Sequence, residues 1–363
     1  MKILFLVPYP TDQSPSQRFR FEQYLIMLEG AGYHIHTQSF LPAGSWKVFY
    51  SSGHHLQKLV LLIAGFSGRI YQLIQCKDYH YIFIHREATP LGPPIIEWAI
   101  AKIFRKKIIY DFDDAIWLTD KTGEPTWERS IRCRSKVAKI CRWSHKVSCG
   151  NPYLARYARQ FNANVVINPT TIDTINQHNP ALFDKSFLKS KNQITGRVIG
   201  WTGSHSTLKY LENLYPVLLK LFGLHPNVCL LVIADRPPAF ELKNLLFKKW
   251  SKETEVADLM LADIGIMPLP DDEWAKGKCG FKALQYLALQ IPCVASPVGV
   301  NPAMVKTGET GFLAASGDEW LACLDALIQD EGLRGKMGVA GRKLVEKNYS
   351  VAANTANFLS LFT

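Results

Sequence analysis

The chain has 363 residues and a formal net charge of +11, with 47% hydrophobic and 20% charged residues. These proportions are typical of globular proteins and exclude a disordered or fibrous chain, and the length suits two domains that each bury a core. The eight cysteines are scattered without the paired spacing of a zinc site. We therefore expect free thiols in a reducing, cytoplasmic compartment and no bound metal ion.

Membrane-spanning and targeting segments are not expected from the sequence. The best apolar run, residues 59–66, lies between Lys58 and Arg69, and it does not approach the roughly 20 residues of a membrane span. The first ten residues predict a buried strand instead of a signal peptide.

Strand and helix signals alternate along the first half of the chain, which predicts α/β layers with parallel sheets. We expect strands at residues 3–7, 34–39, 81–85, 107–111, 146–149 and 164–167. We expect helices at residues 18–29, 54–75, 93–104, 126–142 and 152–161. This order predicts a Rossmann-like N-terminal domain over residues 1–170.

The second half of the chain repeats this alternation. We expect strands at residues 197–201, 229–234, 264–268 and 292–296, and helices at residues 207–222, 240–250, 281–290 and 319–330. Residues 333–362 are expected to be helical without further strands. The polar, weakly periodic stretch 171–194 predicts a hinge, which is followed by a second Rossmann-like domain over residues 195–348.

The segment from residue 262 to residue 301 has the order strand, cationic loop, helix, strand and glycine turn. Lys276, Lys278 and Gly280 precede a helix that begins at Phe281, and Lys282 lies in its first turn. Free backbone N–H groups, the positive end of the helix dipole and the lysines would together hold a diphosphate. An ordinary βαβ unit with solvated surface lysines explains the same spacing.

A second turn of this kind follows the first strand of the second half. Gly203 and Ser204 lie between that strand and the next helix, and His205 and Lys209 are the nearest basic residues. Backbone N–H groups at such a turn can form a nest for an anion. Alternatively, the hydroxyl side chains of the turn simply cap the helix.

In the first half, polar residues follow two neighbouring strands. His85 and Glu87 come at the end of the third strand, and Asp111, Asp113 and Asp114 come at the end of the fourth. Clustered carboxylates are costly unless they are solvated, cap a helix, bind a cation or accept a proton. For His85, the alternative is a strand-end histidine that is satisfied by the backbone.

The residue order of segment 262–301 resembles the donor-binding half of retaining glycosyltransferases of family 4, whose GT-B architecture is two Rossmann-like domains facing an interdomain cleft. The downstream sequence IPCVASPVGVN fits the family pattern. The two glutamates that the family usually carries fall here on Gly277 and Gln285, so neither carboxylate is present. A branch of the family has the variant Lys-x-x-Phe-Lys-x-x-Gln-Tyr that occurs here.

The resemblance implies a metal-independent transfer of a hexose from a nucleotide diphosphate sugar to an acceptor hydroxyl, with retained configuration and no further cofactor. It implies donor binding by Gly203, Ser204, Lys209, Lys278, Gly280, Phe281, Lys282 and Gln285. His85 and Glu87 would orient the sugar. Asp113 and Asp114 are interpreted as acceptor-side groups, of which Asp113 would serve as a base or bind a hydroxyl and Asp114 would contact the acceptor. Arg18 would contact the acceptor or a phosphate, or is simply an exposed arginine of the first helical turn. The C-terminal helix, residues 349–362, would pack back on the N-terminal domain.

A basic stretch from residue 129 to residue 159 has nine Lys or Arg residues and no Asp or Glu. A solvated helix surface explains it, and so does a face for anionic lipid at the inner side of the plasma membrane. With the resemblance, it indicates a saccharide or lipid-linked acceptor, as in bacterial surface polysaccharide or glycoconjugate biosynthesis. Nucleic-acid binding is not expected, because the stretch alone supplies neither stacking nor groove-reading elements.

Two other functions are left open by the sequence. A nucleotide-sugar epimerase of the same fold would convert the donor without an acceptor. A non-enzymatic protein that binds a sugar nucleotide or a polyanion is favoured by the missing glutamate pair.

Overall fold

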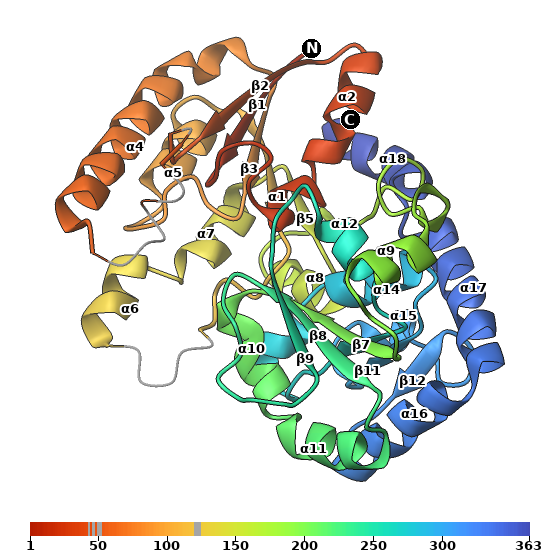
Figure 1. The fold of residues 1–363 in the computed structure, drawn as a ribbon. Helices are drawn as coiled ribbons and strands as arrows, with labels where there is room; N and C mark the ends of the chain where they lie inside the picture. Colours follow the sequence, from red (N-terminus) through yellow and green to blue (C-terminus); the bar gives the residue numbers. More distant parts are fainter. Residues whose placement is uncertain (43, 46–47, 49–52, 120–124) are drawn as a thin grey trace. The chain divides into compact units, whose positions relative to one another are not determined.

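The computed structural model describes residues 1–363 except 43, 46–47, 49–52 and 120–124 (Figure 1). The chain forms two compact units. Unit 1 consists of Met1–Thr170, Gly277–Cys279 and Asn354–Thr363, and unit 2 consists of Thr171–Lys276 and Gly280–Ala353. Each unit is built on a six-stranded parallel sheet. The predicted fold class, two Rossmann-like α/β domains with parallel sheets, is confirmed.

The sheet of unit 1 has the strand order β2-β1-β3-β4-β5-β6. Its strands are β1 (Lys2–Val7), β2 (His34–Ser39), β3 (Tyr81–His85), β4 (Lys107–Phe112), β5 (Lys146–Cys149) and β6 (Val165–Ile167). Their apolar runs are buried because helices cover both faces of a parallel sheet. The strand order reverses between β1 and β3, and ligands of such sheets bind beyond the carboxyl ends at that point.

The helices of unit 1 are shorter than the sequence predicts. They are α1 (Pro15–Arg18), α2 (Leu25–Gly30), α4 (His55–Gln75), α5 (Ile95–Lys102), α6 (Thr126–Arg132), α7 (Lys136–Trp143) and α8 (Pro152–Arg159). The expected single helix at 126–142 is wrong, because Cys133 adopts the left-handed conformation, with φ of 48°, between α6 and α7. The expected helix at 18–29 is likewise divided between α1, a 3₁₀ turn at Glu22–Tyr24 and α2.

The C-terminal end of the chain contributes to the core of unit 1. Helix α18 (Val351–Leu359) is followed by a 3₁₀ turn at Ser360–Phe362. The ring of Phe358 stacks on Tyr24 at a centroid distance of 4.5 Å, and Phe362 lies 6.2 Å from Phe83. These rings are buried. Aromatic packing therefore joins the last residues of the chain to the first sheet.

The sheet of unit 2 has the strand order β12-β11-β10-β7-β8-β9. Its strands are β7 (Val198–Thr202), β8 (Cys229–Ala234), β9 (Leu245–Lys249), β10 (Ile264–Met267), β11 (Cys293–Ala295) and β12 (Gly311–Leu313). The expected helix at 240–250 is wrong: it contains β9, a half-exposed edge strand that pairs with β8. Its weak burial leaves no clear strand pattern in the sequence.

The helices of unit 2 surround this sheet (Figure 1). They are α9 (Lys185–Lys191), α10 (His205–Glu212), α11 (Tyr215–Leu224), α12 (Glu255–Leu259), α13 (Glu273–Lys276), α14 (Phe281–Ala288), α15 (Asn301–Met304), α16 (Gly317–Gln329) and α17 (Glu331–Asn348). The helix expected at 207–222 is two helices, with Pro216 in the first turn of the second. The stretch 171–194, expected as a hinge, contains α9.

Candidate active site

A buried network at the carboxyl ends of the unit 1 strands is centred on Asp111. The Asp111 carboxylate accepts hydrogen bonds from Arg20 and from Ser148, whose Oγ lies 2.6 Å away. His85 Nδ1 lies 2.8 Å from Asp111 Oδ2. Burial would raise the pKa of Asp111, but the Arg20 guanidinium and the His85 hydrogen bond hold this pKa well below its ordinary value. Asp111 is therefore an ionised anchor for Arg20 and His85.

His85 is fully buried in this network. Its Nδ1 faces Asp111, and its Nε2 lies 3.5 Å from Ser16 Oγ in α1. Contact between His85 and a sugar stays a prediction. Such a contact would be made at Nε2, the ring nitrogen that faces Ser16. Arg20 was not among the residues that the sequence predicts for the site. Its position between Phe19 and Phe21, which are both core residues, is the one feature of the sequence that indicates its burial.

A second network joins Arg86 to the next two carboxylates. Arg86 donates to Asp113 Oδ1 and to Asp114 Oδ2, each at 2.8 Å, and Lys278 Nζ lies 2.9 Å from Asp114 Oδ1. Burial would raise the pKa of Asp114, but Lys278 and Arg86 lower it. Arg86 itself has φ of 59°, a conformation that costs energy outside glycine. Asp114 is thus held as an anion, and both carboxylates face cations.

The segment Gly277–Cys279 belongs to unit 1, although its neighbours in the sequence belong to unit 2. Asn151 Nδ2 donates to the carbonyl groups of Gly277 and Lys278 at 3.0 and 3.1 Å. Cys279 Sγ donates to the Asp113 carbonyl at 3.1 Å. A Cβ atom on Gly150 would lie 2.4 Å from Cys279 Sγ. Gly150 therefore allows the close approach that places Lys278 beside Asp114.

The remaining predicted residues of unit 1 have partners of their own. Glu87 Oε2 lies 2.7 Å from Lys136 Nζ, which is almost fully buried. Arg18 is 8% exposed, with its guanidinium 5.0 Å from the Phe19 ring and its Nε 3.7 Å from Asp12 Oδ1. The structure brings Asp113, Asp114 and Lys278 together. Glu87 and Arg18 make other contacts, and their roles stay predictions.

In unit 2, the turn between β7 and α10 holds an acidic side chain. The Gly203 N–H donates to the Ile233 carbonyl at 3.0 Å, and Ser204 Oγ lies 2.9 Å from Ser206 Oγ. Asp235, which follows β8, accepts from the His205 N–H and faces His205 Nδ1, both at 2.6 Å. A carboxylate is favourable at this end of a helix. The turn thus already stabilises one anion.

The N-terminus of α14 begins at Gly280, which has φ of 69° and lies against Met304. A side chain at this position would be strained and would clash with that methionine. Lys282 Nζ lies 5.2 Å above the Trp201 ring, which is a cation–π contact. Phe281, the first residue of α14, is half-buried.

Helix α14 also contacts strand β7 through a hydrogen bond. The Thr202 N–H donates to Tyr286 Oη at 3.1 Å. Since Gly203 follows Thr202 directly, the two predicted turns lie near each other in unit 2. Gln285 is buried, and its Nε2 lies 3.4 Å from His178 Nε2. Lys209 Nζ lies 5.3 Å above the Tyr210 ring. Lysines on aromatic rings keep their charge while part of their surface is covered.

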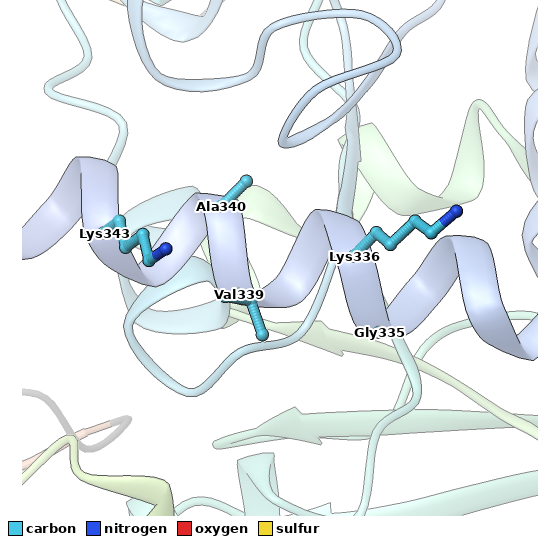
Figure 2. A pocket seen from close by; sticks show the side chains of 5 residues that line it. All are labelled: Gly335, Lys336, Val339, Ala340 and Lys343. Carbon is cyan, nitrogen blue, oxygen red and sulfur yellow. The ribbon is translucent and has the colours of Figure 1, made fainter.

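Among the residues that the structure describes, no group of three or more His, Cys, Asp or Glu side chains is placed to hold a metal ion. Figure 2 shows a shallow depression whose lining residues all come from the single helix α17, namely Gly335, Lys336, Val339, Ala340 and Lys343. This lining contains none of the predicted site residues.

Comparisons with known proteins give a family likeness for the second half of the chain and a fold likeness for nearly all of it. A family model described as glycosyl transferases group 1 matches residues 196–330, which contain both α10 and α14. The search of curated proteins finds no significant match.

Solved structures resemble nearly the whole chain. Sucrose-phosphate synthase from Thermosynechococcus elongatus has a TM-score of 0.73 at 14% identity, covering 100% of this chain and 98% of that one. HepE from Anabaena, in complex with UDP and glucose, has a TM-score of 0.67 at 14% identity, covering 99% and 98%. A glycosyltransferase from Rickettsia africae has a TM-score of 0.71 at 14% identity, covering 99% and 97%. At this identity, the likeness shows that the fold is GT-B.

Proposed function

We propose that this protein is a nucleotide-sugar glycosyltransferase. The observation that carries the proposal is the convergence of two helix N-termini inside residues 196–330, the part that matches the glycosyl transferases group 1 model. The hydrogen bond from Thr202 to Tyr286 and the contact of Lys282 with Trp201 bring these N-termini together. Such termini stabilise phosphate groups through free N–H groups and the helix dipole. HepE, which was solved with UDP, supports a nucleotide diphosphate donor.

The leaving diphosphate is the centre of the proposed chemistry. The N-terminus of α14 at Gly280 and Phe281 would receive its oxygens, and Lys282 would offset the charge that develops as the sugar leaves. This is electrostatic stabilisation of the transition state. Gly203 and Ser204 would line the same site, although the Gly203 N–H itself donates to Ile233. Lys209 and Lys278 would add positive charge, and Gln285 would bind a donor hydroxyl as a neutral group. We also propose a hexose donor, metal-independent transfer and retained configuration, which are what the resemblance to family 4 implies.

The acceptor side of the reaction is proposed for unit 1. Asp113 and Asp114 both accept from Arg86, and Asp114 also pairs with Lys278. We propose that either receives a hydrogen bond or a proton from an acceptor hydroxyl. His85 and Glu87 would orient the sugar, and Arg18 would contact the acceptor. We propose a saccharide or lipid-linked acceptor in surface polysaccharide or glycoconjugate synthesis at the cytoplasmic side of the membrane, where nucleotide sugars are the donors.

The first test compares two lysines near the α14 N-terminus. Lys282→Ala should lower kcat by about 10²–10³, the usual loss when one transition-state donor is removed. Lys276→Ala is the matched control, because Lys276 already pairs with Asp271 and Glu273 and should leave kcat nearly unchanged. Equal rates for Lys282→Ala and wild type, measured with radiolabelled donor, would refute the phosphate role of Lys282.

The second test separates transfer from the two alternatives. In a thermal-shift screen with UDP, GDP and their sugars, the nucleotides of one base should raise the melting temperature of the protein, because a ligand that binds only the native state stabilises it. Incubation of that sugar nucleotide without acceptor should leave the sugar's configuration unchanged, whereas an epimerase would convert it. Turnover that collapses in EDTA would contradict metal independence, and no thermal shift with any nucleotide would contradict the proposed donor.

A further inference from the structure

The outer face of α4 is apolar along its whole length. This helix has 21 residues, and seven of its large apolar side chains are 54–76% exposed: Leu56, Leu59, Val60, Ile63, Ile70, Tyr71 and Ile74. Their spacing of three, four and seven residues puts them on one side of the helix. A water-facing helix normally carries polar and charged residues on this side, so the face is built to be covered.

The inner face of α4 is unexpectedly polar. Arg69 is 1% exposed and donates to the carbonyl groups of Val7, Ala88 and Gln38 at 2.6, 2.7 and 3.0 Å. Burial lowers the pKa of Arg69 to about 9. Gln72, which is also buried, accepts from Arg69 at 2.7 Å. Arg69, Gln72 and the ring of Phe66, which packs on Phe40, thus attach α4 to unit 1, while seven of its large apolar side chains point outward.

Helix α4 and the turn after it, His55–Asp78, are long and apolar enough to cross a membrane by length and composition, so the expectation that no segment approaches this length is wrong. Only 22% of its apolar window is buried, so it is not a core helix either. Crossing a bilayer would break the hydrogen bonds of Arg69 and place that residue in hydrocarbon, which is costly. The helix therefore suits a position along a bilayer surface.

Positive charge borders this apolar face. Helix α5 packs against α4 (Figure 1), and Lys102 and Arg105 at its C-terminal end are exposed. Exposed Lys77 directly follows α4, and Lys106 Nζ donates to its carbonyl at 2.5 Å. Trp98 of α5 is 44% exposed. Exposed aromatic and basic residues beside an apolar helix face are the composition of helices that lie on anionic membranes.

The basic stretch at residues 129–159 is less suited to lipid than its charge indicates. Lys136 is buried and pairs with Glu87. Lys146 donates to the carbonyl groups of Ser360 and Thr363 at 2.6 and 2.9 Å. These cations are therefore used inside unit 1. Other basic residues of the stretch, such as Arg132, are exposed, but among its described side chains Ile131 is the one large apolar residue that is exposed, whereas α4 exposes seven.

We propose that α4 lies in the interface of an anionic lipid bilayer, with its apolar face among the acyl chains. Lys77, Lys102 and Arg105 would contact the lipid headgroups. This inference rests on the exposed surface of unit 1 and does not depend on the proposed glycosyl transfer.

The test is co-sedimentation of the full chain with vesicles of phosphatidylcholine containing 30% phosphatidylglycerol. Wild type should pellet with these vesicles, and Ile63→Glu/Ile70→Glu should reduce its partition coefficient by about tenfold or more. The matched control, Leu219→Glu/Leu224→Glu, changes two exposed apolar residues of α11 in unit 2 and should pellet like wild type. Circular dichroism and thermal unfolding verify that both variants are folded.

Four outcomes would overturn the proposal: wild type stays in the supernatant, the α4 variant pellets like wild type, the α11 variant is lost from the pellet to the same degree, or pure phosphatidylcholine vesicles bind equally well. Light scattering after size-exclusion chromatography tests a second copy of this chain as the occupant. A wild-type dimer that the α4 substitutions dissociate would show that this face binds protein instead of lipid.

Discussion

Each unit contains one histidine–aspartate pair at the carboxyl end of its sheet, and the two pairs differ in burial. His85 and Asp111 lie 2.8 Å apart with at most 1% of either side chain exposed. His205 and Asp235 lie 2.6 Å apart with about half of each side chain exposed. Nearly identical distances thus occur in opposite environments. Water does not screen a buried contact, so the first pair contributes to holding unit 1 together. Water screens the second pair, which is therefore a weak surface contact.

The same difference extends to the rest of the two half-sites. In unit 1, Arg20, Arg86 and Lys278 pair with carboxylates, and these cations lower the pKa of Asp111 and Asp114 despite burial. In unit 2, Lys209 and Lys282 lie over aromatic rings. Each of these three cations of unit 1 is therefore balanced by a carboxylate. Lys282 lies in the first turn of α14, where a diphosphate is expected, whereas Lys209 lies in the last turn of α10.

The largest expected effect on stability comes from neutralising Asp111, and the same change at Asp235 provides the comparison. Asp111→Asn should destabilise unit 1 by about 3–5 kcal/mol, because it leaves Arg20 as a buried charge without its anion. Asp235→Asn should cost less than about 1 kcal/mol. Hydrogen exchange read by peptide mass spectrometry assigns each loss to its unit, which a single unfolding curve of a two-domain chain would not do. Equal losses of stability in the two units would contradict this difference between the two pairs.

Glycine substitutions test how tightly the segment Gly277–Cys279 is held. Gly150→Ala should destabilise the protein by about 1–3 kcal/mol, because its new Cβ would lie 2.4 Å from Cys279 Sγ. It should also lower kcat by displacing Lys278. Gly223→Ala in α11 is the control, since no atom lies within 4 Å of its new Cβ. Differential scanning calorimetry should show it neutral or up to about 1 kcal/mol more stable.

Acid should weaken unit 1 through Asp111 and Asp114. The folded pKa of each is below its ordinary value because of the neighbouring cations, despite burial. The unfolded chain therefore binds more protons as the pH falls, so their contribution is complete above the unfolded pKa of about 3.9 and is lost as the pH falls through the folded values. Asp114→Asn should flatten the loss of exchange protection between about pH 5 and pH 3. An unchanged slope would contradict the pairing.

The smallest effect is expected at Gln285. Gln285→Leu removes the 3.4 Å contact with His178 and should cost about 1 kcal/mol or less in stability. If Gln285 binds a donor hydroxyl, KM for the sugar nucleotide should rise while kcat falls little. Steady-state kinetics separate these parameters, and an unchanged KM would remove Gln285 from the donor site.

Much of the fold was predictable because buried parallel strands leave continuous apolar runs. All six strands of unit 1 lie within one residue of their expected bounds. In unit 2, β9 was mistaken for helix and β12 was not expected. One is a half-exposed edge strand and the other has three residues, so neither has a distinct periodicity. Helix ends were less predictable, since the break at Cys133 depends on one backbone angle.

The candidate site was only partly predictable. Residues that follow strands, such as Asp111 and Gly203, could be identified because the carboxyl ends of parallel strands meet at one edge. Their partners could not, since Arg20 precedes Asp111 by 91 residues and Lys278 follows Asp114 by 164. Sequence spacing carries no signal for ion pairs at such separations.

Segment 262–301 and helix α4 show which properties the sequence determines and which depend on the tertiary structure. Composition and order alone determined the α/β class, the doubling of the domain and the cationic N-terminus of α14, because these depend on local periodicity and residue type. Tertiary structure alone decided that Lys278 pairs with Asp114 and that α4 turns Arg69 inward and its apolar residues outward. Burial and pairing are properties of packed neighbours, and distant parts of the chain become neighbours only when it folds.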